Sequence, residues 1–452
     1  MARTRLTPAP SQQHRPEPDR PQQERSPHAE GRAQADRSGR DDRSRQSEGQ
    51  SHDEPHRSAF SQPRFRRYFP STCLSTLGSW LIRFLFGWAA WDFTASAFWV
   101  GVVASLMLLP TFLLSPLFGI AADRMDPRNG LLVTVSLQGV LAALAGITAS
   151  LDLLGLNALL ALALAFGAVT SAHTPIRLAF LPRLVERAAL PSAIGFSAIV
   201  FNSSRIIGPA VGAALLATTS LPATFVAAAA SCFVATALLL RVHGTARERP
   251  PPSGASIGAQ LRAGLAHVVN TPAIRLVFLL TLTSGLLGRT AIELLPAVSG
   301  QMLEGGAATL AKLTAAAGAG SIVGGLIVSR QSGRLRRLFQ LVLVGLCVAA
   351  ITLLSADLWR SVAAAAVAVA LISLSTTMIG TGCQALVQLS IDESLRGRVM
   401  SLWAVIAMGA PAVGAVIVGS LADEVGFPLA FICVALPALV VVAAAHRRRA
   451  RY

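Results

Sequence analysis

The chain has 452 residues, of which 53% are hydrophobic and 14% charged, and its formal net charge is +16. So few charges over this length exclude an ordinary water-soluble domain and indicate solvation by lipid. Nucleic-acid binding is not indicated, because beyond the N-terminal region the arginines sit at the ends of apolar segments and form no continuous basic face. The five cysteines are solitary and lack C-x-x-C spacing, so we expect no disulfide framework, no metal site and no cofactor.

Residues 1–67 are polar and differ from the rest of the chain. They are rich in Arg, Gln, Asp, Ser and Pro, and they hold ten of the 23 acidic residues. Such a segment cannot bury enough apolar surface to offset its chain entropy, so we predict a disordered cytoplasmic tail. The pair Arg66-Arg67 is faintly similar to a twin-arginine export signal, but no small-residue cleavage site follows it.

Twelve apolar segments of helix length follow, and crossing a bilayer takes about 20 residues in a helix. They cover roughly residues 71–92, 97–121, 129–150, 156–176, 190–217, 222–241, 272–298, 307–329, 336–356, 360–385, 397–421 and 427–445. The sequence therefore predicts an all-α integral membrane protein with twelve transmembrane helices in two six-helix bundles, residues 68–241 and 272–446. A cytoplasmic linker at residues 242–271 carries an amphipathic stretch, and a basic cytoplasmic segment at 447–452 ends the chain.

Arginine is concentrated in every second connection between these segments. The positions are Arg124, Arg128, Arg177, Arg183, Arg187, Arg247, Arg249, Arg262, Arg330, Arg334, Arg336, Arg337, Arg396, Arg398, Arg447, Arg448, Arg449 and Arg451. The opposite connections hold Lys312 and Arg360 together with the acids Asp152, Glu304, Asp357, Asp423 and Glu424. Because basic connections stay on the cytoplasmic side, we predict a multi-pass protein of the inner (plasma) membrane with both termini in the cytoplasm.

An internal repeat relates the two bundles. The segment Gly119 to Arg124 recurs 206 positions later as Gly325 to Arg330, and Arg83 and Arg289 are separated by the same interval. The segment Pro209 to Gly212 recurs 202 positions later as Pro411 to Gly414. The bundles are therefore expected to be pseudo-symmetric copies, and such parallel copies hold a substrate cavity between them near the membrane midplane.

These motifs resemble those of the major facilitator superfamily, in particular the exporter branch with enterobactin-type siderophore exporters and macrolide efflux proteins. The resemblance covers about residues 68–445. Residues 119–128 (GIAADRMDPR) are similar to the loop motif between the second and third helices of that family. Residues 202–212 (NSSRIIGPAVG) are similar to its antiporter motif in the fifth helix, and Arg396-Gly397-Arg398 also resembles this branch.

The resemblance assigns roles to two groups of residues. Gating through the loop motif is expected of Gly119, Asp123, Arg124 and Arg128. Exporter function through the antiporter motif is expected of Asn202, Arg205, Gly208, Pro209 and Gly212. We expect Asp123 to latch onto the segment 394–398 in an outward-facing state. The sequence departs from the family pattern at Asp126, Pro127 and Ala213, and Ser329 replaces the aspartate in the second copy of the loop motif.

Charged side chains within membrane segments are costly and indicate functional positions. Beside Arg205, the candidates are Arg83, Arg289, Glu293 and Asp92. In one interpretation the arginines give the cavity a positive field for an anionic or hydrogen-bonding solute, while Glu293 or Asp92 titrates to couple proton entry to export. In the other, the arginines neutralise these acids and fix the two halves together.

We therefore expect a secondary transporter, acting as a monomer, which exports a small amphipathic organic molecule by proton antiport and alternating access. A siderophore or a drug-like compound is the expected cargo, and the excess of arginine favours a carboxylate or catecholate. The alternatives are a membrane-embedded enzyme and a transporter-like sensor without net transport. No acidic pair, histidine–aspartate pair or Walker loop stands among the spans to support an enzyme.

Overall fold

The helices begin at the edge of the polar tail. In this computed structural model the described residues are 58–124, 126–242, 257–331, 334–391 and 393–447. Most of the predicted tail, residues 1–57, lies outside them. Its last residues are folded: a short 3-10 helix, η1 (Ala59–Ser61), precedes α2 (Pro63–Thr94). The tail therefore ends earlier than predicted, because the rings of Phe60 and Phe65 pack with those of Phe69 and Phe196.

Six long helices make up the first half of the membrane part. They are α2, α3 (Ala97–Arg124), α4 (Pro127–Ser150), α5 (Leu156–Phe180), α6 (Leu190–Thr218) and α7 (Leu221–Leu240). Two 3-10 turns, η2 (Leu181–Arg183) and η3 (Arg187–Ala189), connect α5 to α6. Proline stands in the first turn of α2, α4, α6 and α7, where its missing N–H costs no hydrogen bond.

The second half follows the helix α8 (Ile257–Asn270), which lies in the predicted linker and packs against α9 and α15. Its first span is a chain of short pieces: α9 (Pro272–Ser284), a π-helical turn η4 (Gly285–Arg289), α10 (Thr290–Glu293), α11 (Leu295–Ala297) and a second π turn η5 (Val298–Met302). Then come α12 (Ala307–Ser329), α13 (Leu335–Leu354), the 3-10 turn η6 (Ala356–Leu358), α14 (Val362–Leu389), α15 (Glu393–Val425) and α16 (Phe427–Arg447).

The predicted all-helical membrane fold is confirmed. Within the described residues, eleven helices are long and apolar enough to cross a membrane, and α3 supplies a shorter apolar helix, Ala97–Thr111, at the remaining predicted position. Each predicted span corresponds to one helix, except the seventh, which is the broken run from α9 to η5. Residues 57–452 form one compact unit that contains both halves.

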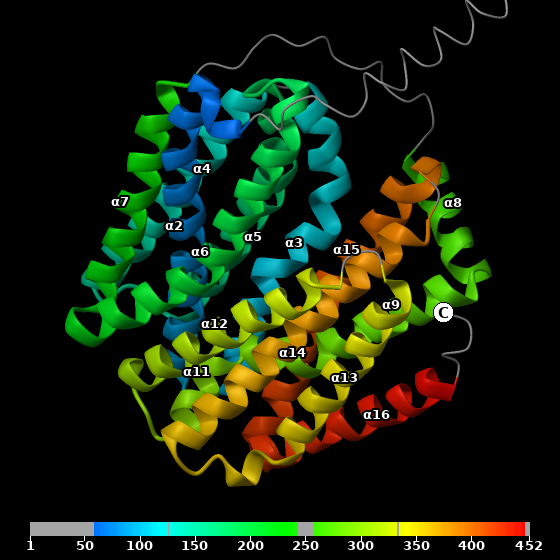
Figure 1. The fold of residues 1–452 in the computed structure, drawn as a ribbon. Coiled ribbons are helices and arrows are strands. Elements are labelled where there is room, and N and C mark those ends of the chain that lie inside the picture. Colours follow the sequence, from blue (N-terminus) through cyan, green and yellow to red (C-terminus); the bar gives the residue numbers. More distant parts are fainter. Residues whose placement is uncertain (1–57, 125, 243–256, 332–333, 392, 448–452) are drawn as a thin grey trace, which may run out of the picture. The chain divides into compact units, whose positions relative to one another are not determined.

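The two halves meet along two helix pairs, α3 with α15 and α6 with α12 (Figure 1). In order of spans these are the second with the eleventh and the fifth with the eighth. When each span is replaced by its counterpart in the other half, the second and eleventh become the eighth and fifth. The contacts therefore have the symmetry that the internal repeat predicts.

The α3–α15 contact is tightest where α3 begins and α15 ends. We call this the acidic end, because Asp423 lies there. The Asp423 carboxylate accepts hydrogen bonds from the backbone N–H groups of Ala97 (2.8 Å) and Phe98 (3.0 Å) and from the Ser96 hydroxyl. A carboxylate from one half thus caps the N-terminus of a helix in the other half, where the helix dipole favours negative charge.

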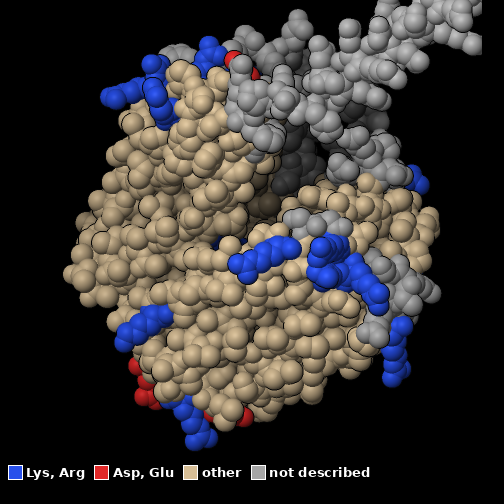
Figure 2. Space-filling view, in the orientation of Figure 1, with Lys and Arg blue, Asp and Glu red and all other residues tan. Residues whose placement is uncertain are grey.

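Glycines allow the backbones of these two helices to touch at the same end. A Cβ atom on Gly101 would overlap the carbonyl of Ala415, and one on Gly419 would overlap the carbonyl of Ala97. From there α3 and α15 diverge toward the other end (Figure 1), and Figure 2 shows the surface hollowed between the halves.

A glycine pair on α12 provides a test of this close packing. A Cβ on Gly320 would overlap the Ala370 carbonyl on α14, whereas one on Gly325 meets nothing within 4 Å. We expect Gly320→Ala to lower the melting temperature of the purified protein, since overpacking costs about 1–3 kcal/mol. Gly325→Ala is the matched control and should leave it equal or higher, because alanine favours the helix by about 1 kcal/mol. Equal melting temperatures for the two variants would contradict the close α12–α14 contact.

Candidate functional site

A cavity of about 470 Å³ lies between the two halves. The first half contributes residues of α2, α3 and α6, and the second contributes residues of the broken span, α12, α14 and α15. This volume falls in the range of small-molecule sites, and the location is where two pseudo-symmetric halves are expected to hold one.

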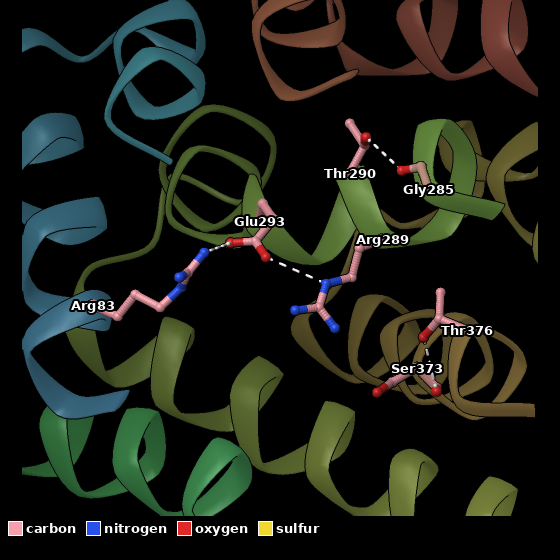
Figure 3. A network of polar contacts seen from close by, with 7 residues as sticks. All are labelled: Arg83, Gly285, Arg289, Thr290, Glu293, Ser373 and Thr376. Atoms are coloured by element: carbon pink, nitrogen blue, oxygen red, sulfur yellow. Dashed lines mark hydrogen bonds and ion pairs between the residues drawn. The ribbon is translucent and has the colours of Figure 1, made fainter. Parts of the chain in front are cut away.

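An ion-pair network crosses the cavity. The Glu293 carboxylate on α10 lies 3.3 Å from Nε of Arg289 on η4 and 3.8 Å from Nη2 of Arg83 on α2 (Figure 3). The side chains of Arg83, Arg289 and Glu293 are only 17%, 24% and 14% exposed. One carboxylate therefore binds a guanidinium from each half. Nη2 of Arg83 is buried and has no hydrogen-bond partner among the described residues, so its link to Glu293 is an ion pair without a hydrogen bond.

The π turn in the seventh span determines where the side chains of Arg289 and Glu293 point. In the π turn η4 the hydroxyl of Thr290 donates to the carbonyl of Gly285 five residues earlier, at 2.9 Å (Figure 3). Gly285 itself lies against Ala410 and Pro411 of α15, where a Cβ atom would not fit. π turns re-aim the residues that follow them and are frequent at functional sites. The predicted span is helical through this turn, and sequence reasoning did not anticipate its π geometry.

A stack of cations and aromatic rings borders the network. The guanidinium of Arg83 lies 5.6 Å from the ring centre of Trp80, whose ring meets that of Phe201 edge-to-face at 5.7 Å. The guanidinium of Arg177 lies 5.6 Å from the ring centre of Phe201. Such geometries are attractive for both cation–π and aromatic pairs. The aromatic rings of Trp80 and Phe201 therefore lie beside the guanidinium groups of Arg83 and Arg177.

Arg205 adds a third guanidinium to the cavity lining. It lies on α6 one helical turn after Phe201, so both side chains share a face. Within the described residues no carboxylate lies within ion-pair distance of Arg205. The lining therefore contains three cationic side chains and one carboxylate, and its electrostatic field is positive.

Hydroxyl groups on α12 and α14 line another part of the cavity. Oγ of Ser321 lies 2.8 Å from Oγ of Ser373, and the hydroxyl of Thr377 donates to Ser321 at 3.1 Å. The hydroxyl of Thr376 donates to the Ser373 carbonyl at 3.0 Å (Figure 3). Sequence reasoning missed this cluster, because Ser and Thr are common in apolar helices and only the α12–α14 contact brings them together.

The antiporter-type motif divides into two parts. Gly208 and Gly212 face α2, where a Cβ atom would overlap Trp80 in the first case and Leu81 and Phe84 in the second. Asn202, Arg205 and Pro209 line the cavity. The glycines thus allow the close contact of α6 with α2, and the other three residues form the cavity wall.

Two further predicted site residues, Asp92 and Arg128, do not line the cavity. Asp92 is exposed. Arg128 donates to the carbonyls of Val242 (2.5 Å) and Leu240 (2.7 Å) at the end of α7, so it binds a helix C-terminus. The side chains of Gly119, Asp123 and Arg124, and those of the segment 394–398, lie outside the described residues, so the expected latch stays a prediction. Among the described residues no group of three His, Cys, Asp or Glu could hold a metal ion.

Comparison with known proteins decides the family. Residues 56–452 match the family described as "Transmembrane secretion effector" (MFS_3). The chain belongs to this family of the major facilitator superfamily. The predicted resemblance is confirmed, and the relatives that match this chain are transporters, not enzymes.

Curated relatives match part of this MFS_3 transporter. The chain is 31% identical over 177 residues to the staphyloferrin A transporter of Staphylococcus aureus, which is 39% of this chain and 45% of that protein. It is 29% identical over 227 residues to the multidrug efflux pump Tap of Mycobacterium tuberculosis, which is 47% of this chain and 52% of that pump. The chain thus spans about half the length of the curated relatives it matches.

Solved structures share the fold of this MFS_3 transporter at low sequence identity. A POT family transporter in complex with 5-aminolevulinic acid has a TM-score of 0.69 at 12% identity, covering 85% of this chain and 96% of that chain. A bacterial homologue of the human lysosomal transporter Spinster, in an inward-facing and unoccupied conformation, has a TM-score of 0.64 at 14% identity, covering 87% and 96%.

Because the Glu293 carboxylate is shared by two guanidinium groups, its removal should lower the stability of the protein. Glu293→Gln leaves Arg83 and Arg289 facing one another without an anion, and removal of one partner from a buried pair costs up to about 3–5 kcal/mol. We expect a lower melting temperature, which the double variant Arg83→Gln/Glu293→Gln partly restores. Asp92→Asn, at an exposed acid of the same membrane part, should change nothing. A double variant no more stable than Glu293→Gln would contradict the cross-cavity pair.

Proposed function

We propose that this MFS_3 protein is a secondary transporter that exports a small amphipathic organic anion from the cytoplasm by proton antiport. The observation that carries the proposal is the cavity between the halves, with three guanidiniums and one carboxylate in its wall. A positively charged cavity attracts anions and discriminates against cations. The names of its relatives, a staphyloferrin A transporter and a multidrug efflux pump, support a siderophore or a drug-like cargo.

The proposed orientation places both termini in the cytoplasm of a bacterial plasma membrane. It rests on the arginines in alternate connections, because basic residues are retained on the cytoplasmic side. In this orientation the acidic end, closed by Asp423, faces outward. Substrate would then enter from the cytoplasmic side, between the diverging ends of α3 and α15.

Alternating access requires the contacts at the acidic end to break. We expect Asp423→Asn to weaken the cap on α3 and to favour a state that is open outward. A cysteine at Thr314 in the cavity wall, in a background without native cysteines, should then react several-fold faster with a membrane-impermeant maleimide added outside.

The control for this experiment is Glu424→Gln. It removes the neighbouring exposed acid, and Glu424 makes no hydrogen bond or ion pair with the other described residues. Labelling that is equally slow in Asp423→Asn and Glu424→Gln would contradict a role of the Asp423 cap in closure.

Glu293 is the proposed proton site. Protonation would neutralise the carboxylate, release Arg83 and Arg289 from it and separate the halves at the cavity. In inside-out membrane vesicles with an acidic lumen, wild-type protein should accumulate a catecholate siderophore in proportion to the pH gradient. Glu293→Gln, at unchanged expression, should lose that stimulation, because the glutamine amide does not ionise and so cannot take up and release a proton during transport.

Asp92→Asn serves as the control, since Asp92 lies outside the cavity and should not affect coupling. Full dependence on the pH gradient in Glu293→Gln would assign the coupling proton to another group. A loss of stimulation in Asp92→Asn, with Glu293→Gln unaffected, would assign it to Asp92.

A further inference from the structure

We propose that Arg205, Phe201 and Trp80 form a subsite for an aromatic carboxylate, with the carboxylate on Arg205 and the aryl ring against the two aromatic side chains. This inference deepens the proposed function and rests on it, since it names the chemical class of the exported anion.

Charge pairing singles out Arg205 among the cations of the cavity. Glu293 lies within ion-pair distance of Arg83 and Arg289, so these two guanidiniums have a protein anion. No carboxylate of the described residues lies within that distance of Arg205, which nevertheless belongs to the cavity wall. A guanidinium in a membrane-embedded wall without a protein anion is a natural partner for an anionic ligand, and its planar fork fits a carboxylate bidentately.

The spacing on α6 places an aromatic surface beside that anion site. Phe201 precedes Arg205 by four residues, so the two side chains are neighbours on one face of the helix. The Phe201 side chain is 39% exposed and lines the cavity. Trp80 meets it edge-to-face from α2. An aryl ring attached directly to a carboxylate therefore reaches the aromatic pair when its carboxylate binds Arg205.

The hydroxyl-lined part of the cavity wall accommodates polar substituents on the ring. The hydroxyls of Ser321, Ser373 and Thr377 form a hydrogen-bonded cluster on α12 and α14, and all three residues line the cavity. Hydroxyl groups can both donate and accept, so they suit phenolic or alcohol groups on the ligand. An aliphatic anion would leave the aromatic side unused, and an aromatic cation would be repelled by Arg205.

Binding of three matched probes to the purified full-length protein tests the subsite. The probes are 2-naphthoate, the neutral 2-naphthamide and the saturated decahydro-2-naphthoate, each measured by calorimetry. We expect 2-naphthoate to bind at least about tenfold more tightly than 2-naphthamide, as a charge-assisted hydrogen-bond pair requires. The saturated carboxylate should bind severalfold more weakly than 2-naphthoate, because it cannot use the aromatic surface.

Three variants assign the preferences to residues. Arg205→Gln should remove the preference for 2-naphthoate over 2-naphthamide, while Arg205→Lys should retain part of it. Phe201→Leu should reduce the difference between 2-naphthoate and its saturated analogue while keeping the preference for the carboxylate. Arg360→Gln, which changes an exposed arginine outside the cavity, is the matched control and should bind all three probes as the wild type does.

The proposal is overturned if 2-naphthoate and 2-naphthamide bind the wild-type protein equally, a result that needs no variant to fold. It is also overturned if Arg205→Gln, eluting as a monodisperse species, keeps the preference for the carboxylate. Its failure is distinguishable from that of the export proposal. Selective binding of 2-naphthoate without pH-driven accumulation in vesicles refutes proton-coupled export, whereas accumulation of a siderophore with no selectivity among the probes refutes the subsite.

Discussion

The cost of a charge inside the bilayer is the constraint on which the cavity depends. A charged side chain at the membrane centre costs about 2.5–3.5 kcal/mol on insertion scales, and three guanidiniums in one cavity would also repel one another. Glu293 offsets much of this by lying between Arg83 of the first half and Arg289 of the second. The same carboxylate thus stabilises the site and joins the halves, so any change in its charge acts on both.

The position of Glu293 depends in turn on the break in the seventh span, and this is the part of the fold that the sequence did not reveal. The apolar run from Pro272 to Val298 has the length of one continuous helix. Its π turn begins at Gly285, which packs against Ala410 and Pro411 of α15, a contact between residues more than a hundred positions apart. The number and order of the spans, by contrast, were predictable. Each apolar run long enough to cross the bilayer is visible in the sequence itself.

The candidate site, like the fold, was predictable from the sequence only in part. Arg83, Arg205, Arg289 and Glu293 were predictable, since a charge within an apolar run is conspicuous in a single sequence. The pair of Arg289 with Glu293 was also predictable, from their i, i+4 spacing. The acid that pairs with Arg83 was not, because Asp92 has the same chemistry as Glu293, yet it is exposed at the end of α2. The hydroxyl cluster and the edge-to-face pair of Trp80 and Phe201 arise from helix contacts, which composition and periodicity do not contain.

The internal repeat explains why the cavity has an excess of positive charge. Arg83 and Arg289 are equivalent positions, 206 residues apart, and both are retained. The position that corresponds to Glu293 in the first half is Gly87, and the one that corresponds to Arg205 in the second half, 202 residues later, is Ala407. Both Gly87 and Ala407 line the cavity. Each half therefore contributes one charge that the other lacks, a carboxylate from the second and a cation from the first. A symmetric fold thereby obtains one carboxylate and one cation without a protein anion among the described residues, the two groups on which the proposed exchange of a proton for an anion depends.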